Sequence, residues 1–377
     1  MIFVNKRKYF IISISIIFML IAAFVILLKK PESLNNKNNV SKSDELLADN
    51  HFYKEFSDNF KVDVDLPDIS NKTKDVIFAK LAGFDENIIK SIFFDGKEPE
   101  KKQYDDAFTL VTGDSTATIV QPFCFYYETE DLQSVKFPTE NFTTKYEQSN
   151  YNMLPNYSDV YKLKNLDFMN RDDAVEYVIS VLKKMGISVS EKVEIYAIDY
   201  KTMQDYQDSK KENDPDIASM YQIKDRFTKD DEFYILCLTT IINEIPVTHY
   251  TYHMSGGKRD IPGSNIKVYL SKKGIFNFDA SGIYKAQNVA ESPTNLITAE
   301  EAIEKAFYLY DSIVTTDKVT VTDICFEYGF VPYNKNYDEV KLTPTWTLTL
   351  SYENDENSII RPCEIISINA VTGEQIN

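Results

Sequence analysis

The feature that most constrains the fold of this chain is an internal repeat. The stretches Phe168–Tyr200 and Leu296–Tyr328 align without a gap at a constant offset of 128 residues. Each stretch has the pattern of an amphipathic helix, a short connection and a strand, and a helix N-cap residue stands at the same place in both, Asn170 and Thr298. We therefore predict two copies of one α+β unit, in which a helix packs on an antiparallel sheet.

The helix of each copy has one apolar face and clear end signals. Gly186 ends the first helix, and Thr298-Ala-Glu-Glu301 forms a capping box at the start of the second. Apolar residues spaced by three and four predict the buried faces. In the first copy these are Ala174, Val175, Val178, Val181, Leu182 and Met185; in the second they are Ala302, Ile303, Ala306, Phe307, Tyr310 and Ile313.

Strands follow each helix. In the second copy, apolar residues alternate strictly with hydroxyl residues, which predicts a strand with one solvent-exposed side. The expected buried side carries Trp346, Leu348, Leu350 and Tyr352, and the expected exposed side carries Thr345, Thr347, Thr349 and Ser351.

Three motifs of the second copy follow one another in a distinctive order. They are T-x-E-E-A from Thr298, L-x-P-x-W over Leu342–Trp346, and a closing N-A-V-T-G-E over Asn369–Glu374. This order, over about residues 165–377, resembles the PepSY-like repeat and the C-terminal part of the YycI and YycH regulators. In the first copy, Ile245-Pro246-Val247 is similar to a variant of the same repeat, with Glu244 where glycine is usual. The resemblance implies an extracytoplasmic protein that acts on a sensor histidine kinase.

The N-terminal folded segment predicts a small α+β domain with a connector, residues 51–160, before the repeat units at 161–292 and 293–377. Within it we expect strands at Phe60–Leu66, Ala107–Val111 and Thr116–Tyr127. We expect a helix over Asp75–Phe94, interrupted near Gly83. For the acidic insert Asp205–Asp231, in the first repeat unit, we expect a solvated loop, with or without a short helix.

An uncharged run of twenty residues, Tyr9–Leu28, lies between Lys6-Arg7-Lys8 and Lys29-Lys30. Twenty helical residues rise roughly 30 Å, the thickness of a hydrocarbon core. We predict an uncleaved transmembrane anchor with ends at Tyr9 and Leu28, a cytoplasmic tail at 1–8 and a flexible tether at 29–50. The C-terminal region is then extracellular, in a single-pass protein of the cell membrane. A cleaved signal peptide and a buried soluble helix are the alternatives.

The charge of the chain excludes one class of partner. The formal net charge is −17, although residues 1–30 carry basic groups and no acid. Nucleic-acid phosphates require a basic face, so we expect no nucleic-acid binding. The abundance of Asn, Lys and Ile is similar to that of low-GC Gram-positive bacteria.

The sequence contains no recognisable catalytic, cofactor or metal-binding motif. His249 and His253 would chelate zinc on a helix, but Thr248–His253 alternates like a strand, where four residues span about 13 Å. The chain has no G-x-S-x-G turn, and Gly256-Gly257 lacks the spacing of a phosphate loop. We expect no cofactor and no catalytic residue.

The four cysteines are too far apart in sequence for a metal site. Cys325 and Cys363 lie on predicted strands of one small sheet, on sides that both face away from its core. These positions predict a disulfide between them.

These observations predict a membrane-anchored binding protein that modulates another envelope protein, such as a sensor kinase, a protease or an assembly factor. The alternative is a cell-wall enzyme that processes carbohydrate or peptide with carboxylates. A deep cleft of converging carboxylates would favour the enzyme, and an exposed aromatic face would favour the binding protein.

Overall fold

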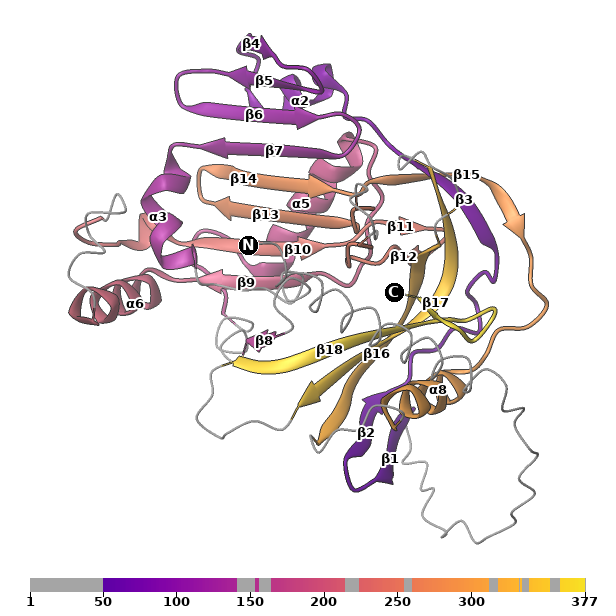
Figure 1. The fold of residues 1–377 in the computed structure, drawn as a ribbon. Helices are drawn as coiled ribbons and strands as arrows, with labels where there is room; N and C mark the ends of the chain where they lie inside the picture. The colour runs from indigo at the N-terminus through magenta and orange to yellow at the C-terminus, as the bar shows by residue number, and fades with distance from the viewer. Residues whose placement is uncertain are drawn as a thin grey trace, which may run out of the picture. The chain divides into compact units, whose positions relative to one another are not determined.

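The structure is a computed structural model, and it describes residues 50–140, 153–155, 164–213, 224–253, 260–311, 318–331, 333, 339–352 and 360–376. Leu46–Asn377 forms one compact unit; a second unit, Met1–Glu45, lies outside the described residues. Strands dominate the described part of the larger unit, which contains sheets of nine, eight and two strands (Figure 1).

The nine-stranded sheet is organised around the long hairpin of β16 (Val319–Val331) and β17 (Glu339–Tyr352). Its main path runs β1-β2-β16-β17-β18-β19, β8 pairs with β18, β3 pairs with the first residues of β17, and β15 pairs with β3. Only the β2–β16 pair is parallel among the described strands. The other members are β1 (His51–Ser57), β2 (Phe60–Asp65), β3 (Val76–Leu81), β8 (Met153–Pro155), β15 (Tyr284–Glu291), β18 (Ile360–Asn369) and β19 (Gln375–Ile376).

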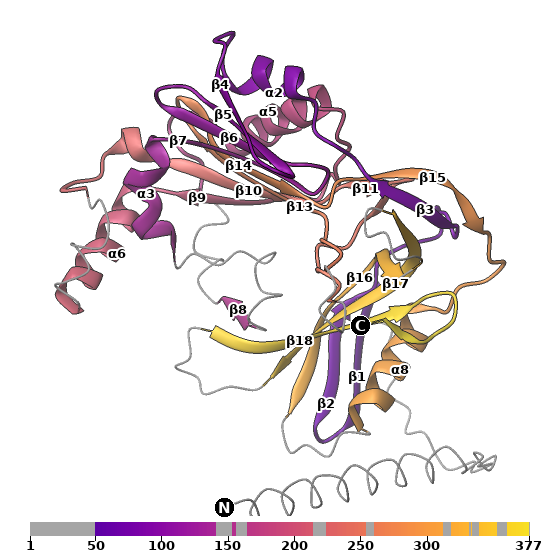
Figure 2. The same ribbon diagram turned by 45° about the horizontal axis from the view of Figure 1, so that its top comes forward.

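The eight-stranded sheet is an antiparallel sheet of order β4-β5-β6-β7-β14-β13-β10-β9 (Figure 2). Its strands are β4 (Glu100–Gln103), β5 (Ala107–Val111), β6 (Ser115–Val120), β7 (Cys124–Thr129), β9 (Glu194–Ile198), β10 (Phe233–Leu238), β13 (Asn265–Ser271) and β14 (Gly274–Ser281). The two-stranded sheet pairs β11 (Ile241–Ile242) with β12 (Ile245–Pro246).

Helices cover both faces of the eight-stranded sheet, which explains why β10 is apolar at every position. Alternate residues of β10 enter two different cores: Tyr234 packs with residues of α2 (Glu86–Phe93) and α5 (Arg171–Lys184), and Phe233 packs with Val135 of α3 (Asp131–Glu140) and Met203 of α6 (Tyr200–Asn213). A strand that is buried on both faces needs no polar alternation.

Local capping sets where the repeat helices begin. The Asn170 side chain accepts a hydrogen bond from the Asp173 N–H (2.9 Å) at the start of α5. At the start of α8 (Ala299–Asp311), the Glu301 N–H donates to the Thr298 hydroxyl (3.2 Å) and the Thr298 N–H donates to the Glu301 carboxylate (2.8 Å). Both predicted N-caps and the capping box are therefore confirmed.

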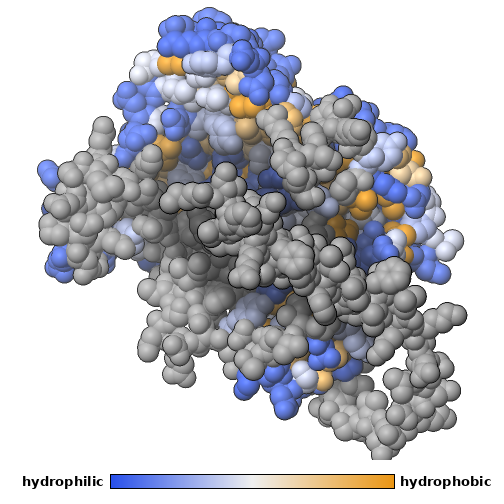
Figure 3. All heavy atoms as spheres, in the orientation of Figure 1, coloured by the Kyte–Doolittle hydropathy of each residue, from blue (hydrophilic) through white to orange (hydrophobic). Residues whose placement is uncertain are grey.

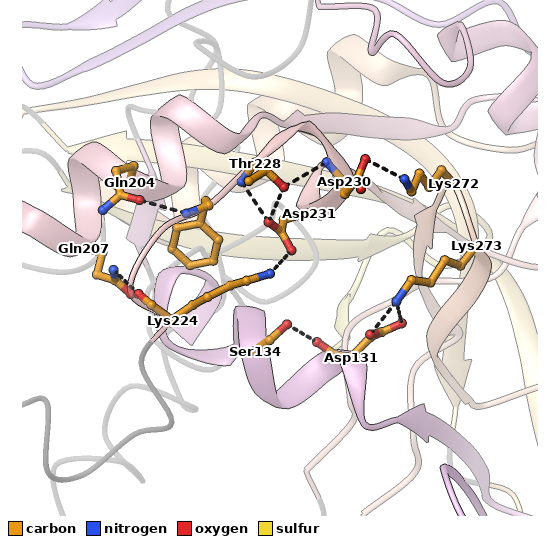
Figure 4. Close-up of polar contacts among 11 residues, drawn as sticks. Asp131, Ser134, Gln204, Gln207, Lys224, Thr228, Asp230, Asp231, Lys272 and Lys273 are labelled. Atoms are coloured by element: carbon orange, nitrogen blue, oxygen red, sulfur yellow. Dashed lines mark hydrogen bonds and ion pairs between the residues drawn. The ribbon is translucent and has the colours of Figure 1, made fainter.

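The segment between β9 and β10 contains more regular structure than the expected solvated loop with or without a short helix: its described part includes the fourteen-residue helix α6 and a short 3₁₀ helix, η2 (Lys229–Asp231). Ion pairs attach the surrounding elements to the β13–β14 turn (Figure 4). Lys273 Nζ donates to both carboxylate oxygens of Asp131 in α3 (2.9 and 3.0 Å), and Lys272 Nζ lies 2.5 Å from Asp230 in η2. The turn thus holds two separate elements of the layer that covers this face.

The expected architecture of a small N-terminal domain followed by two helix-on-sheet units is wrong. The N-terminal strands do not form their own sheet: β1, β2 and β3 join the nine-stranded sheet, and β4 to β7 join the eight-stranded sheet. The structure is mostly β, and each repeat helix packs on a sheet that strands from distant parts of the chain complete. The predicted helix Asp75–Phe94 is also corrected, because its first half is β3 and only Glu86–Phe93 is helical.

The membrane predictions are corrected too. No helix in the part of the chain that the structure describes is long and apolar enough to cross a membrane. The predicted single-pass membrane localisation and attachment through an N-terminal helix thus find no span among these residues; the predicted span from Tyr9 to Leu28 lies outside them.

The predicted exposed side of β17 is buried. Thr345, Thr347, Thr349 and Ser351 are at most 7% exposed. The Thr345 hydroxyl donates to the Thr343 carbonyl (2.9 Å), and the Thr347 hydroxyl donates to the buried Glu327 carboxylate (2.7 Å). The alternation of residue types correctly predicted which side chains of β17 share a face. It could not show that other parts of the chain cover both faces.

Strand register excludes the predicted disulfide. Cys325 pairs opposite Thr347 and Cys363 pairs opposite Ser351, on the two sides of β17. The cysteines are thus separated by a whole strand and by a four-residue shift of about 13 Å, whereas bonded cysteines have Cα atoms less than about 7 Å apart.

Glu232, which precedes β10, makes stability depend on pH. It is 6% exposed; burial raises its pKa, as do Asp199 and Asp167, although the Tyr200 N–H donates to it (3.4 Å). A carboxyl group with a raised folded-state pKa loses its proton at lower pH in the unfolded chain than in the folded one. Stability therefore falls as pH rises from the ordinary glutamate value to the raised one.

We expect Glu232→Gln to remove this fall while keeping an acceptor for the Tyr200 N–H. Urea unfolding midpoints of both proteins between pH 4 and pH 8 would measure it. The stability of the variant relative to the wild type should increase as pH rises, and should then stay constant above the raised pKa of Glu232. If the stability of the variant relative to the wild type decreased as pH rises, the pKa of Glu232 would not be raised in the folded protein.

Candidate functional site

A groove of about 550 Å³ lies at the N-terminal end of α8. Phe326 of β16 and Trp346 of β17 contribute its apolar floor, the loop 66–74 between β2 and β3 contributes one wall, and the segment Leu296–Glu300 contributes the other. On the face seen in Figure 3, the described surface is mainly hydrophilic and its hydrophobic areas are small and separate.

The floor is held rigidly. Trp346 is 1% exposed, and its ring centroid lies 4.9 Å from that of Phe326. The indole Nε1–H donates to the Ile297 carbonyl (3.0 Å), while the Ile297 N–H donates to the Ala370 carbonyl (2.8 Å). One residue of the wall is thereby fixed to both β17 and the end of β18.

The loop wall is held by its own main chain. The Leu66 N–H donates to the Asn50 carbonyl (2.8 Å), and the Lys72 N–H donates to the Ile69 carbonyl (3.0 Å). The Ser70 N–H donates to Asp68 Oδ1 (2.8 Å); this backbone bond, with one from the Ser70 side chain, holds the pKa of Asp68 below its usual range. The loop is thus pre-formed.

Two lysines tie this wall to distant segments. Lys72 Nζ donates to the Glu244 carbonyl (2.9 Å), and Lys74 Nζ donates to the Thr294 carbonyl (3.3 Å). Glu244 lies in the β11–β12 turn with a left-handed backbone (φ 64°). That conformation explains why glycine would be favoured at this position.

A second hollow, of about 420 Å³, lies beside the β13–β14 turn and has an acidic rim. Two of its carboxylates, Asp131 and Asp114, are held by neighbouring side chains. Asp131 holds Lys273, and bonds from the Thr112 and Ser115 hydroxyls keep the pKa of Asp114 below its usual range. A glycosidase-type acid requires a raised pKa. The pKa of Asp114 is shifted in the opposite direction.

The structure places the two candidate histidines apart from any metal-ligating cluster. His253 Nδ1 lies 2.9 Å from Asp260 Oδ2, and the His249 and Tyr250 rings contact each other in a tilted arrangement, with 3.9 Å between their centroids. Among the described residues, no three His, Cys, Asp or Glu side chains are grouped to hold a metal ion. Thr248–His253 is not a regular strand, contrary to expectation; Tyr252 makes an isolated bridge to Ile261.

Sequence patterns identified only part of the groove. Thr298 and Trp346 stood out as a capping residue and as part of a motif, but neither was predicted to line a site. Lys72 and Lys74 were missed altogether. The nearest signal is Pro67, which ends a strand and starts the loop.

Comparisons with known proteins add a fold relationship. No protein-family model and no curated protein matches the chain. Among solved structures, the chain is similar to the crystal structure of an uncharacterized protein from Eubacterium rectale ATCC 33656, with a TM-score of 0.61 and 18% sequence identity over 87% of this chain and 93% of that chain. At this identity the similarity establishes a shared fold alone.

Proposed function

We propose that this protein is a non-enzymatic binding protein that regulates a partner protein by holding an extended segment of that partner in the groove at α8. The observation that carries the proposal is the groove itself, with its apolar floor at Phe326 and Trp346 and its pre-formed walls. A pre-formed groove lowers the entropy cost of holding a flexible segment. The resemblance to the YycI and YycH regulators makes a sensor histidine kinase the first class of partner to test.

Panning a displayed library of random twelve-residue peptides on the full-length chain tests the groove. We expect selected peptides to bind Ile69→Lys at least about tenfold more weakly than the wild type, because the substitution adds a charge to the apolar part of the groove. Fluorescence anisotropy with the labelled peptides gives the dissociation constants.

Val289→Lys, on β15, is the matched control, since Val289 is an apolar residue with 51% exposure that does not line the groove. Its affinity should stay within about twofold of the wild type. Ser70→Trp, which adds bulk at an exposed groove position, repeats the test should Ile69→Lys unfold. Peptides that bind all variants equally, or a library that yields no binder, would refute the proposal.

A further inference from the structure

We propose that the groove selects an acidic partner segment, in which an apolar side chain enters the groove and a neighbouring Asp or Glu carboxylate meets Lys72 and Lys74. This inference rests on the proposed function and names the chemistry of its ligand. The two lysines lie on one wall, two residues apart, beside the apolar floor.

The ammonium groups of these lysines keep their charge available. Each donates to a main-chain carbonyl, and neither forms an ion pair with a carboxylate among the described residues. Other lysines of this acidic protein are paired: Lys341 Nζ lies 2.5 Å from Glu291, for example. A bond to a carbonyl positions an ammonium group without neutralising it, and its remaining N–H groups can still donate.

The acids of the groove do not neutralise the pair. Asp68 turns its carboxylate onto the Ser70 amide of its own loop. The exposed Glu300 lies in the first turn of α8, where the helix dipole stabilises negative charge. Glu301, which does not line the groove, accepts a hydrogen bond from the Thr298 N–H. An incoming carboxylate would therefore find Lys72 and Lys74 as its charged partners, in charge-assisted hydrogen bonds.

The apolar floor and the lysine pair together specify one occupant. A wholly apolar peptide would bring no carboxylate to the two ammonium groups. A small anion would bring no apolar side chain to pack on Phe326 and Trp346. An extended segment spans about 3.3 Å per residue, so a carboxylate one or two residues from the buried side chain can reach the lysine wall.

A double-mutant cycle tests this inference with a groove-dependent peptide from the library, meaning one that Ile69→Lys weakens. Lys72→Gln/Lys74→Gln should weaken an acidic peptide about tenfold or more. It should change the affinity of the same peptide with Glu→Gln by no more than about twofold, because the coupling resides in the charge pair. Lys61→Gln/Lys285→Gln, outside the groove, is the control and should leave both affinities unchanged.

The outcomes separate the two proposals. Groove-dependent peptides without acidic residues, or an acidic peptide that is insensitive to the lysine changes, would overturn the inference and leave the proposed function standing. An acidic peptide that loses binding only when its C-terminal carboxylate is amidated would also overturn it, since the groove would then read a chain end. Peptides that are insensitive to Ile69→Lys would overturn the proposed function itself.

Discussion

Replacement of Trp346 by alanine is expected to lower the free energy of unfolding by about 3–5 kcal/mol, the range for deletion of a large buried aromatic side chain. Trp346 is 1% exposed and packs against Phe326 beneath the groove. Its loss also removes the hydrogen bond to the Ile297 carbonyl. The variant should lose peptide binding, because the floor and the Ile297 wall depend on the same side chain.

Urea unfolding followed by far-ultraviolet circular dichroism measures this change, because Trp346 is the single tryptophan of the chain and its removal eliminates the fluorescence probe. Tyr308→Ala is the control: Tyr308 is 67% exposed on α8, and we expect a change within about 0.5 kcal/mol. A loss below about 1 kcal/mol in Trp346→Ala would mean that the floor is not tightly packed.

Alanine at Gly282 should be comparably damaging, with a loss above about 3 kcal/mol or no soluble protein. The residue has a left-handed backbone (φ 62°), and an added Cβ would lie 2.1 Å from the Gly263 carbonyl oxygen. Gly263 cannot move away, because it is itself packed against the His249 main chain. A Cβ added at Gly263 would lie 2.1 Å from the His249 carbonyl oxygen. Three main-chain segments, at Gly282, Gly263 and His249, therefore meet where no side chain fits.

Two other glycines separate the cost of the steric clash from the cost of the left-handed backbone. Gly96→Ala meets open space but has φ 74°, so it should cost only the left-handed strain of roughly 1–2 kcal/mol. Gly113→Ala has neither feature and should be nearly neutral. Thermal unfolding of the three variants should rank them in this order, and equal losses at Gly282 and Gly96 would contradict the close crossing of the chain.

The sequence predicted elements well where the signal is local. The caps at Asn170 and Thr298, the glycine stop at Gly186 (φ 72°) and the strand Ala107–Val111 agree with the structure. Each depends on hydrogen bonds or dihedral angles within a few residues, so the local sequence contains the information.

Prediction failed where pairing decides the outcome. Val76–Leu81 has apolar residues compatible with helix or strand, and it is β3 because β15 and β17 pair with its two edges. Those partners lie about 200 or more residues away in sequence. Periodicity within a short apolar run cannot reveal such distant partners.

The sequence by itself determined the acidic charge, the starts of the repeat helices and the alternation of faces along β17. Only the tertiary structure decided which sheet each N-terminal strand joins, that the hydroxyl face of β17 is buried, and that the loop carrying Lys72 and Lys74 lies beside Trp346. The physical reason is that caps and periodicity act within a few residues, whereas sheet pairing and the walls of a groove bring together main-chain groups that are hundreds of residues apart.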